Sequence, residues 1–301
     1  MIPLQSWRSL VGDEPAVALK PGQVWQVGAW VLKRENPFGA ADPRSRLMDA
    51  RRILTHLAAE GNPVSVPVLT DDHEPAAEHD GDYYTLSPHL PGNTEAGTLI
   101  QLKCLGAGIA KLHQALDTCP TNIHSWEIHL AERTFGESWP LLEVALPAAD
   151  SARLSEAVLP VREGMAKAFE GLPSQRIHGD CHAGNILFVG DELTGFIDLD
   201  HLPIGPRTYD LGYYLSCGIT YCTDQGEHPT DALNRLGPPL FAGYESVSRL
   251  SDAEWEAIVP IMLSAQLTLA GWYFRAGIQN RADRSLNFVH WLAGMAGWTP
   301  A

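Results

Sequence analysis

Cysteine and basic charge are both scarce in this chain of 301 residues. Its five cysteines form an odd number and contain no Cys-x-x-Cys pair, which disfavours a disulfide framework and favours a reducing, cytoplasmic setting. The 21 lysine and arginine residues are outnumbered by 36 aspartate and glutamate residues, giving a formal net charge of −15. Such an acidic surface is expected to repel nucleic acids and anionic membranes, so we expect neither as a partner.

Membrane-directed segments are also lacking. The first residues, MIPLQSWRSLVGDEP, have no basic segment followed by an apolar one, so no secretory signal is expected. The most apolar stretch, residues 258–274, contains proline, serine, glutamine and threonine, and we predict a buried helix there rather than a membrane span. With 45% hydrophobic and 19% charged residues, the composition is typical of a globular protein, and the length suits one large domain or two lobes.

The order of secondary-structure signals divides the chain into two parts. Residues 1–90 are rich in β-forming segments, which include a hairpin predicted over residues 23–33 and a strand predicted over residues 64–70. The segment 88–97 contains proline and glycine and marks a boundary, after which residues 91–301 are mainly helical. The pattern therefore predicts an α+β fold with a small β-rich lobe and a larger helical lobe.

The stretch RIHGDCHAGNILFVGDELTGFIDLD, residues 176–200, carries the strongest chemical signal. Two short apolar strands flank a turn, so the predicted hairpin would bring Asp180, Asn185 and Asp198 into one small volume. Phosphoryl transfer needs magnesium held by hard oxygen ligands, which Asn185 and Asp198 can supply. It also needs a carboxylate that orients the attacking hydroxyl and accepts its proton, a role open to Asp180. The spacing from Asp180 to Asn185 matches that of the kinase catalytic loop.

The segments HGDCHAGNILF and FIDLDH resemble the catalytic core of the aminoglycoside phosphotransferase and choline kinase superfamily, small-molecule relatives of the protein kinases. LGAGIAKLHQAL and GPRTYDLGYYL are similar to the helices that flank that core, and residues 241–258 resemble the type II homoserine kinase branch. The resemblance implies a bilobal protein-kinase-like fold, with residues 1–90 as a nucleotide-binding N-lobe and residues 91–301 as a helical C-lobe. It also implies ATP or GTP and Mg²⁺ as cofactors.

On the nucleotide side, the resemblance implies that Lys33 neutralises the phosphates, and Lys20 is the only other lysine in the small lobe. It implies an acidic partner for Lys33 on the following helix, for which Asp49 is the candidate, and backbone contacts to the base from Ser87 and His89. The chain departs from the kinase pattern in one respect. No Gly-x-Gly-x-x-Gly loop precedes Lys33, so the turn that covers the phosphates is shorter or built differently.

Three further residues have supporting roles in the resemblance. His178 braces the catalytic loop as a buried histidine. Asp210 hydrogen-bonds the backbone of that loop from the start of a helix, where it can also act as an N-cap. Asp200 is either a second acid near the metal or near a cationic substrate, or a carboxylate on the surface of a loop.

The sequence leaves the acceptor site open. Acidic side chains such as Glu227, Asp231 and Glu245 could bind a polyamine or lie on a solvated face. Aromatic residues late in the chain could cage a quaternary ammonium group or pack helices together. These aromatic residues are Tyr213, Tyr214, Trp255, Trp272, Tyr273 and Trp291.

We expect a small-molecule O-phosphotransferase that uses ATP or GTP and magnesium, with an aminoglycoside-like antibiotic or a metabolite as the hydroxyl acceptor. Homoserine and choline or ethanolamine are alternative acceptors, and a nucleotide-binding pseudokinase is an alternative function. A protein kinase is disfavoured by the His-Gly-Asp pattern and by the lack of an Ala-Pro-Glu signature. The expected protein is a monomer or a homodimer.

Overall fold

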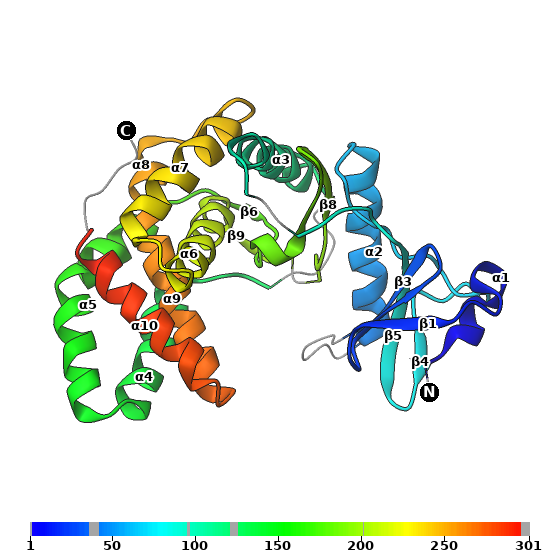
Figure 1. Ribbon diagram of the computed structural model, residues 1–301, viewed down its shortest axis with the longest axis horizontal. Helices are drawn as coiled ribbons and strands as arrows, with labels where there is room; N and C mark the ends of the chain where they lie inside the picture. The colour runs from blue at the N-terminus through cyan, green and yellow to red at the C-terminus, as the bar shows by residue number, and fades with distance from the viewer. Residues whose placement is uncertain (1, 36–41, 95–96, 121–125, 201, 296–301) are drawn as a thin grey trace.

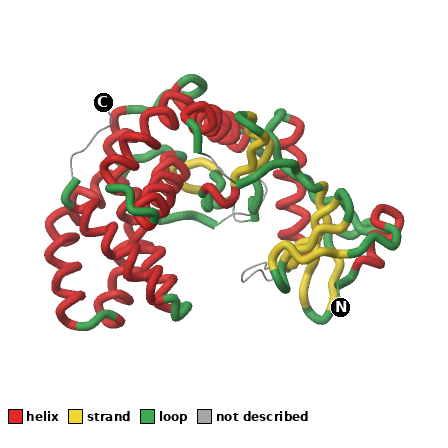
Figure 2. Tube along the Cα trace, viewed as in Figure 1, coloured by secondary structure: helices red, strands yellow, loops and turns green. Residues whose placement is uncertain are grey.

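The computed structural model describes residues 2–35, 42–94, 97–120, 126–200 and 202–295. The chain forms two lobes (Figure 1), and strands gather in the smaller N-lobe whereas helices dominate the larger C-lobe (Figure 2). Helix α2 (Pro43–Ala59) stands between the N-lobe sheet and the C-lobe. The predicted α+β, two-lobed arrangement is therefore confirmed.

The N-lobe is built on a five-stranded antiparallel sheet with strand order β1-β2-β3-β5-β4. A 3₁₀ turn, η1 (Leu4–Trp7), and helix α1 (Arg8–Val11) precede the sheet. The strands are β1 (Ala16–Lys20), β2 (Val24–Val27), β3 (Trp30–Glu35), β4 (Ala77–His79) and β5 (Asp82–Pro88). The predicted hairpin is formed by β2 and β3, and Gly28 in its turn has φ +56°, a conformation that favours glycine.

Successive side chains of β3 point alternately into the core of the N-lobe and toward the opposite face of the sheet, which carries Lys33. Leu32 is fully buried in a cluster with Trp7, Val27 and Leu86. Because successive side chains of a strand point to opposite faces, Lys33 leaves the sheet on the other face. β3 pairs with β2 on one side and with β5 on the other, so two hydrogen-bonded ladders hold the backbone that carries Lys33.

The strand predicted over residues 64–70 is wrong. The segment forms only two isolated bridges, at Val64 and Val68. Pro63 and Pro67 directly precede these two valines, and proline has no backbone N–H to donate to a ladder. The β-branched residues of this segment therefore do not extend the sheet.

The C-lobe combines helices with two small two-stranded sheets. Strands β6 (Ser174–Arg176) and β9 (Ile204–Pro206) form one sheet, and β7 (Ile186–Val189) and β8 (Glu192–Phe196) form the hairpin predicted from the motif. The helices are α3 (Leu99–Asp117), the π-helical segment η2 (Glu132–Ser138), α4 (Trp139–Ala145), α5 (Ala148–Phe169), α6 (Thr208–Asp224), α7 (Pro229–Glu245), α8 (Asp252–Glu256), α9 (Ile258–Arg275) and α10 (Gln279–Ala293).

Helix α9 lies in the core of the C-lobe, where it packs against α6, α10 and η2. Within the described part of the chain, Asp252–Arg275 is the one helical stretch long and apolar enough to cross a membrane, and 67% of its most apolar window is buried. Packing against neighbouring helices therefore accounts for its apolar composition, as predicted for a buried helix.

Helices α3 and α7 approach closely because glycines face the opposite backbone. A Cβ atom on Gly106 would lie 1.9 Å from the carbonyl oxygen of Leu240, and one on Gly243 would lie 2.0 Å from that of Lys103. Neither distance leaves room for a side chain. The contact fixes α3 in the C-lobe, and α3 carries His113 to the base of the catalytic loop.

Gly106→Ala should destabilise the protein by at least about 1–3 kcal/mol, the usual cost of overpacking a close contact. Gly164→Ala on α5 is the matched control, because no atom lies within 4 Å of its Cβ position and alanine favours a helix. Denaturant midpoints measure both effects. A Gly106→Ala protein as stable as the wild type would contradict the close crossing.

Candidate active site

The catalytic-loop motif brings Asp180 and Asn185 into direct contact. Asn185 ends the 3₁₀ turn η3 (Ala183–Asn185), and its Nδ2 donates to the Asp180 carbonyl oxygen at 2.9 Å and to Asp180 Oδ2 at 3.2 Å. Tyr213, on α6, donates its hydroxyl to Asp180 Oδ1 at 2.9 Å. Neighbouring donors therefore orient both carboxylate oxygens of Asp180.

Asp198 follows β8 on the other arm of the hairpin. It has φ +61°, a backbone conformation that is rare for residues other than glycine and recurs at functional sites. The ammonium group of Lys33 forms ion pairs with the carboxylates of both Asp198 and Asp200. A cation from the N-lobe sheet is thus bound by acids of the C-lobe hairpin, and the structure brings these three predicted site residues together.

The charges in this cluster shift one another's pKa values. Burial alone would lower the pKa of Lys33, but the carboxylates of Asp200, Glu35 and Asp198 outweigh it and raise this pKa above its ordinary value. Burial raises the pKa of Glu35 to about 7, and the negative charge of Asp200 acts in the same direction. Burial also raises the pKa of Asp200, against the lowering effect of Lys33. Lys33 therefore keeps its charge among more carboxylates than one ammonium can neutralise.

The structure does not bring Asp49, the acidic partner that the resemblance implies, into contact with Lys33. Its carboxylate forms an ion pair with Arg52, three residues further along α2, at 3.1 Å. The Lys33 side chain reaches the end of the hairpin instead, where Asp198 and Asp200 present two carboxylates to it. Asp49 lies on the wall of the cleft between the lobes.

The residues expected to contact the nucleotide base lie in or beside the N-lobe sheet. Ser87 pairs with Val31 in the ladder between β3 and β5, and the backbone amide of His89 donates to the Ala29 carbonyl at 2.8 Å. The His89 amide is therefore already engaged within the N-lobe, and neither residue is among those that line the cleft. Their contact with a base stays a prediction.

Asp210 is a fully buried anchor beneath the catalytic loop. It accepts hydrogen bonds from the backbone amides of His178 at 2.9 Å and Gly179 at 2.8 Å, and His113 Nε2 lies 2.9 Å from its carboxylate. Burial alone would raise the pKa of Asp210, but the contact with His113 and the other donors hold it below its ordinary value. His113 also contacts the Tyr244 hydroxyl at 3.0 Å, so α3, α6, α7 and the loop share one network.

His178 and Asp200 take clear positions in the structure. The His178 ring is fully buried, and its Nδ1 accepts from the backbone amide of Asp180 at 3.4 Å. This position fits the bracing role that the resemblance implies. Asp200 lies beside the Lys33 ammonium on the wall of the cleft, so it is not a carboxylate that faces solvent alone.

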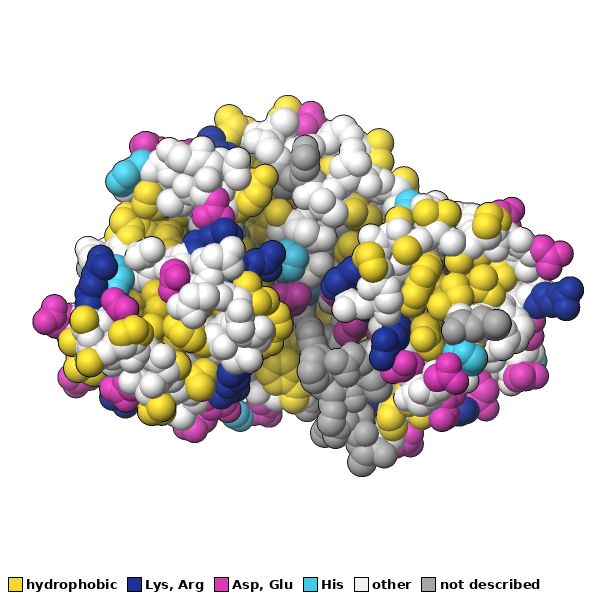
Figure 3. All heavy atoms as spheres, turned by 60° about the horizontal axis from the view of Figure 1, so that its bottom comes forward, with side chains coloured by type: hydrophobic (Ala, Val, Ile, Leu, Met, Phe, Trp, Pro, Cys, Tyr) yellow, Lys and Arg dark blue, Asp and Glu magenta, His cyan; other side chains and the backbone are white. Residues whose placement is uncertain are grey.

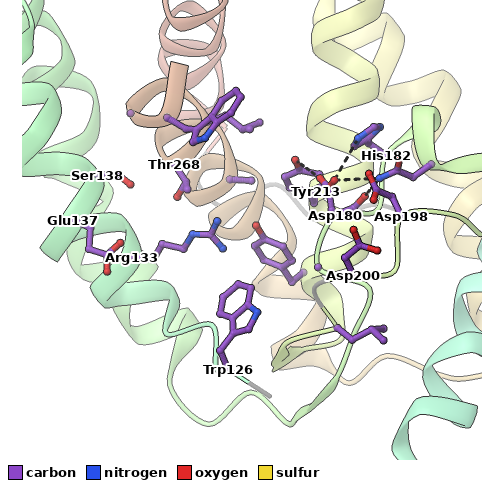
Figure 4. Close-up of a pocket in the computed structure, with 18 of the residues that line it drawn as sticks. Trp126, Arg133, Glu137, Ser138, Asp180, His182, Asp198, Asp200, Tyr213 and Thr268 are labelled. Carbon is purple, nitrogen blue, oxygen red and sulfur yellow. Dashed lines mark hydrogen bonds and ion pairs between the residues drawn. The ribbon is translucent and has the colours of Figure 1, made fainter. Parts of the chain in front are cut away.

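A cleft of about 1360 Å³ contains these catalytic groups. In the space-filling view, a hollow lies between the lobes, with basic side chains around it and acidic ones near its centre (Figure 3). Figure 4 shows Asp180 and Tyr213 on one side of the pocket and Arg133 and Trp126 on the other. The catalytic side is lined by Asp180, Asn185, Asp198 and Asp200.

Part of the late aromatic set reaches this cleft. Tyr213, Trp272 and Tyr273 line it. Trp255 packs at a tilt against Phe241 instead, and Trp291 stacks on Phe288, both among the C-lobe helices. The residues that line the cleft do not include the acidic candidates Glu227, Asp231 and Glu245.

Asn185, Asp198 and Asp200 offer the hard oxygen donors that magnesium prefers. The described residues contain no cluster of three or more His, Cys, Asp or Glu side chains placed to hold a metal by themselves. This arrangement fits Mg²⁺, which is commonly bound by one or two carboxylates while substrate phosphates and water complete its shell. The excess negative charge beside Lys33 has the sign that such an ion requires.

A two-lobed fold with an Asp, Asn and Asp hairpin at its cleft belongs to the protein-kinase-like class. The model of the Phosphotransferase enzyme family matches residues 22–249, and the chain belongs to this family. The resemblance to the aminoglycoside phosphotransferase superfamily is thereby confirmed. The narrower likeness to the homoserine kinase branch stays a prediction.

Known relatives and structures agree with this assignment. The chain is 26% identical over 233 residues to the serine/threonine protein kinase RdoA of Salmonella typhimurium, an alignment that covers 76% of this chain and 66% of that protein. A microcompartment-associated aminopropanol kinase shares the fold with a TM-score of 0.75 at 18% identity, over 97% of this chain and 94% of the other. The amicoumacin kinase hAmiN, in complex with AMP-PNP, Ca²⁺ and Ami, has a TM-score of 0.70 at 16% identity, over 93% and 87%.

Sequence reasoning missed Glu35 and Arg133 and did not connect Tyr213 with Asp180. Glu35 could have been found, because residues two apart in a strand share a face and Lys33 lies two positions earlier. Tyr213 lies within the segment that resembles the family, but its contact with Asp180 depends on how α6 packs. No local motif marks Arg133, which reaches the cleft from η2.

Asp210→Asn should lower the free energy of unfolding by about 1–3 kcal/mol at pH 7, because it removes a buried charge that three donors satisfy. The folded pKa of Asp210 is lowered, so its stabilisation is present above the unfolded pKa of about 4 and is lost as the pH falls through the folded value. Denaturant midpoints from pH 7 to pH 3 measure this, with the exposed Asp231→Asn as control. If the difference in free energy of unfolding between Asp210→Asn and the wild type stayed constant down to pH 3, the role of Asp210 as a charged anchor would be contradicted.

Proposed function

We propose that this protein is a magnesium-dependent O-phosphotransferase that moves the γ-phosphate of ATP or GTP to a hydroxyl group of a small molecule. The observation that carries the proposal is the Asp180 carboxylate, which lines the cleft and is oriented by Asn185 and Tyr213. A lysine from the other lobe lies with its carboxylate partners in the same site. A base beside a phosphate-binding cation is what phosphoryl transfer to an alcohol requires.

Asp180 orients the acceptor hydroxyl and takes its proton as the hydroxyl oxygen attacks the γ-phosphorus. The bond from the γ-phosphorus to the nucleoside diphosphate breaks as the new phosphorus–oxygen bond forms. Tyr213 and Asn185 hold the carboxylate in one geometry before the acceptor arrives, so little reorganisation is needed in the reaction.

Lys33 neutralises the α- and β-phosphates of the bound nucleotide and gives up its carboxylate partners in doing so. Asn185 and Asp198 are the residues that would hold magnesium, and the bound ion would offset the negative charge of the phosphates. Asp200 remains beside the site as a further carboxylate. This exchange of partners accounts for the presence of one lysine among several acids.

The remaining details of nucleotide binding are part of the same proposal. Asp49, on the cleft wall, and Ser87 and His89, at the end of β5 and just beyond it, stay the proposed nucleotide contacts. The cytoplasmic setting and the monomeric or homodimeric state also stay predictions.

A second candidate function is transfer to a serine or threonine hydroxyl of a protein. The observation that favours it is the 26% identity to a relative named serine/threonine protein kinase. Radiolabelled ATP, offered with a panel of small alcohols and separately with casein, distinguishes the two. A pseudokinase would bind the nucleotide and label neither.

Asp180→Asn should lower kcat by about 10²–10⁴-fold and leave nucleotide affinity unchanged, because the variant folds around the same site without its base. Tyr213→Phe should lower kcat by up to about tenfold, since Asp180 loses one orienting hydrogen bond. Initial rates with the best acceptor of the panel measure both. Tyr221→Phe is the matched control, because Tyr221 is exposed on the same helix. A near-normal kcat in Asp180→Asn would identify another residue as the base.

A further inference from the structure

The part of the cleft lining that the C-lobe helices supply includes basic side chains, although the chain has a formal net charge of −15. Arg133 comes from η2, Arg275 ends α9, and Arg281 lies on α10. All three line the cleft. An arginine cluster in the binding cleft of an acidic protein indicates a ligand of opposite charge.

Arg133 is half-buried and has no carboxylate partner among the described residues. Its guanidinium lies 6.0 Å from the centre of the Trp126 ring, and Figure 4 shows the side chain extending into the pocket between Trp126 and Thr268. Glu137, four residues along the same segment, also lines the cleft but forms no ion pair with it. Other arginines of this protein do have such partners, as Arg207 has in Glu254 at 2.6 Å and Arg284 in Asp224 at 2.6 Å.

Two stacked tyrosines connect Arg133 with the proposed base. Burial raises the pKa of Tyr209 to about 12, and Arg133 is close enough to oppose that effect. The Tyr209 ring stacks on Tyr213 with their centres 5.7 Å apart, and Tyr213 donates to Asp180. A ligand that reached from Arg133 to Asp180 would therefore lie along this pair of rings.

The other two arginines add positive charge to the lining of the same cleft. Arg281 lies over the Tyr273 ring, with its guanidinium 5.7 Å from the ring centre, and Arg275 is exposed. Neither forms an ion pair with a carboxylate of the described chain. A ligand ammonium placed here would meet positive charges of its own sign, whereas a carboxylate or phosphate would find planar, bidentate donors.

We propose that the acceptor is a hydroxy acid, whose carboxylate or phosphate binds Arg133 while its hydroxyl lies at Asp180. The proposal rests on the phosphotransferase function and narrows its acceptor class. A polycationic aminoglycoside does not fit this part of the cleft lining. The residue that selects the acceptor is then Arg133, and Trp126 positions its guanidinium.

Binding without turnover tests the proposal. The protein, saturated with AMP-PNP and magnesium, is titrated with glycolate, 3-hydroxypropionate, 4-hydroxybutyrate and glycerol 3-phosphate, and ligand-observed NMR reports affinity. The matched probes are 1,4-butanediol, 4-amino-1-butanol and kanamycin. The variants are Arg133→Gln, Arg133→Lys, which keeps the charge, and Arg153→Gln, an exposed arginine outside the cleft, as control.

At least one hydroxy acid should bind the wild type better than every neutral or cationic probe. Arg133→Gln should weaken it by about tenfold or more, since a charge-assisted contact is lost, whereas Arg133→Lys should weaken it less and Arg153→Gln should leave it unchanged. Comparing 4-hydroxybutyrate with glycerol 3-phosphate separates a carboxylate from a phosphate ligand.

Preferential binding of 4-amino-1-butanol or kanamycin would overturn the proposal. Hydroxy-acid affinity that Arg133→Gln leaves unchanged, or a wild type that binds no hydroxy acid, would overturn it as well. None of these results bears on phosphoryl transfer itself, which the Asp180→Asn rates decide. If the protein binds a hydroxy acid tightly but transfers no phosphate, the proposed phosphotransferase function is wrong. The anion-binding site at Arg133 would still stand.

Discussion

One ammonium group held between two carboxylates joins the N-lobe sheet to the catalytic hairpin. Lys33 reaches this position because β3 alternates, with Leu32 buried in the N-lobe core and Lys33 on the opposite face. Asp198, with its rare positive φ, and Asp200 receive it at the end of β8. The nearby carboxylates carry more negative charge than one lysine can neutralise. The cluster is therefore suited to an exchange in which the carboxylates bind a metal ion and Lys33 binds phosphate groups.

The catalytic loop that carries Asp180 depends on a fully buried charge, the carboxylate of Asp210. Asp210 fixes the backbone at His178 and Gly179, and this fixes where Asp180 can lie. Tyr213, one turn further along the helix that Asp210 opens, donates to Asp180. The α3–α7 contact supports the same network, because His113 links Asp210 to Tyr244. Packing far from the cleft thus sets the geometry of the proposed base.

The sequence predicted the features that local spacing determines. Asp180, Asn185 and Asp198 could be placed together because a short hairpin allows few arrangements, and the two-lobed fold followed from the order of strands and helices. The ion pairs of Lys33 could not be predicted, since the resemblance led to Asp49 on the following helix, and only the relative position of the lobes brings Asp198 and Asp200 to Lys33. The cleft residues around Arg133 could not be predicted for the same reason. Arg133 and Thr268 come from distant segments without a shared motif.

The central claim is that Lys33 and the hairpin acids form a centre for phosphoryl transfer and exchange partners when nucleotide binds. A crystal structure with AMP-PNP and magnesium tests it most directly. The account predicts Lys33 Nζ on the α- and β-phosphates, the metal on Asn185 and Asp198, and the γ-phosphate facing Asp180. A structure in which Lys33 keeps both carboxylates while the nucleotide binds elsewhere would contradict it.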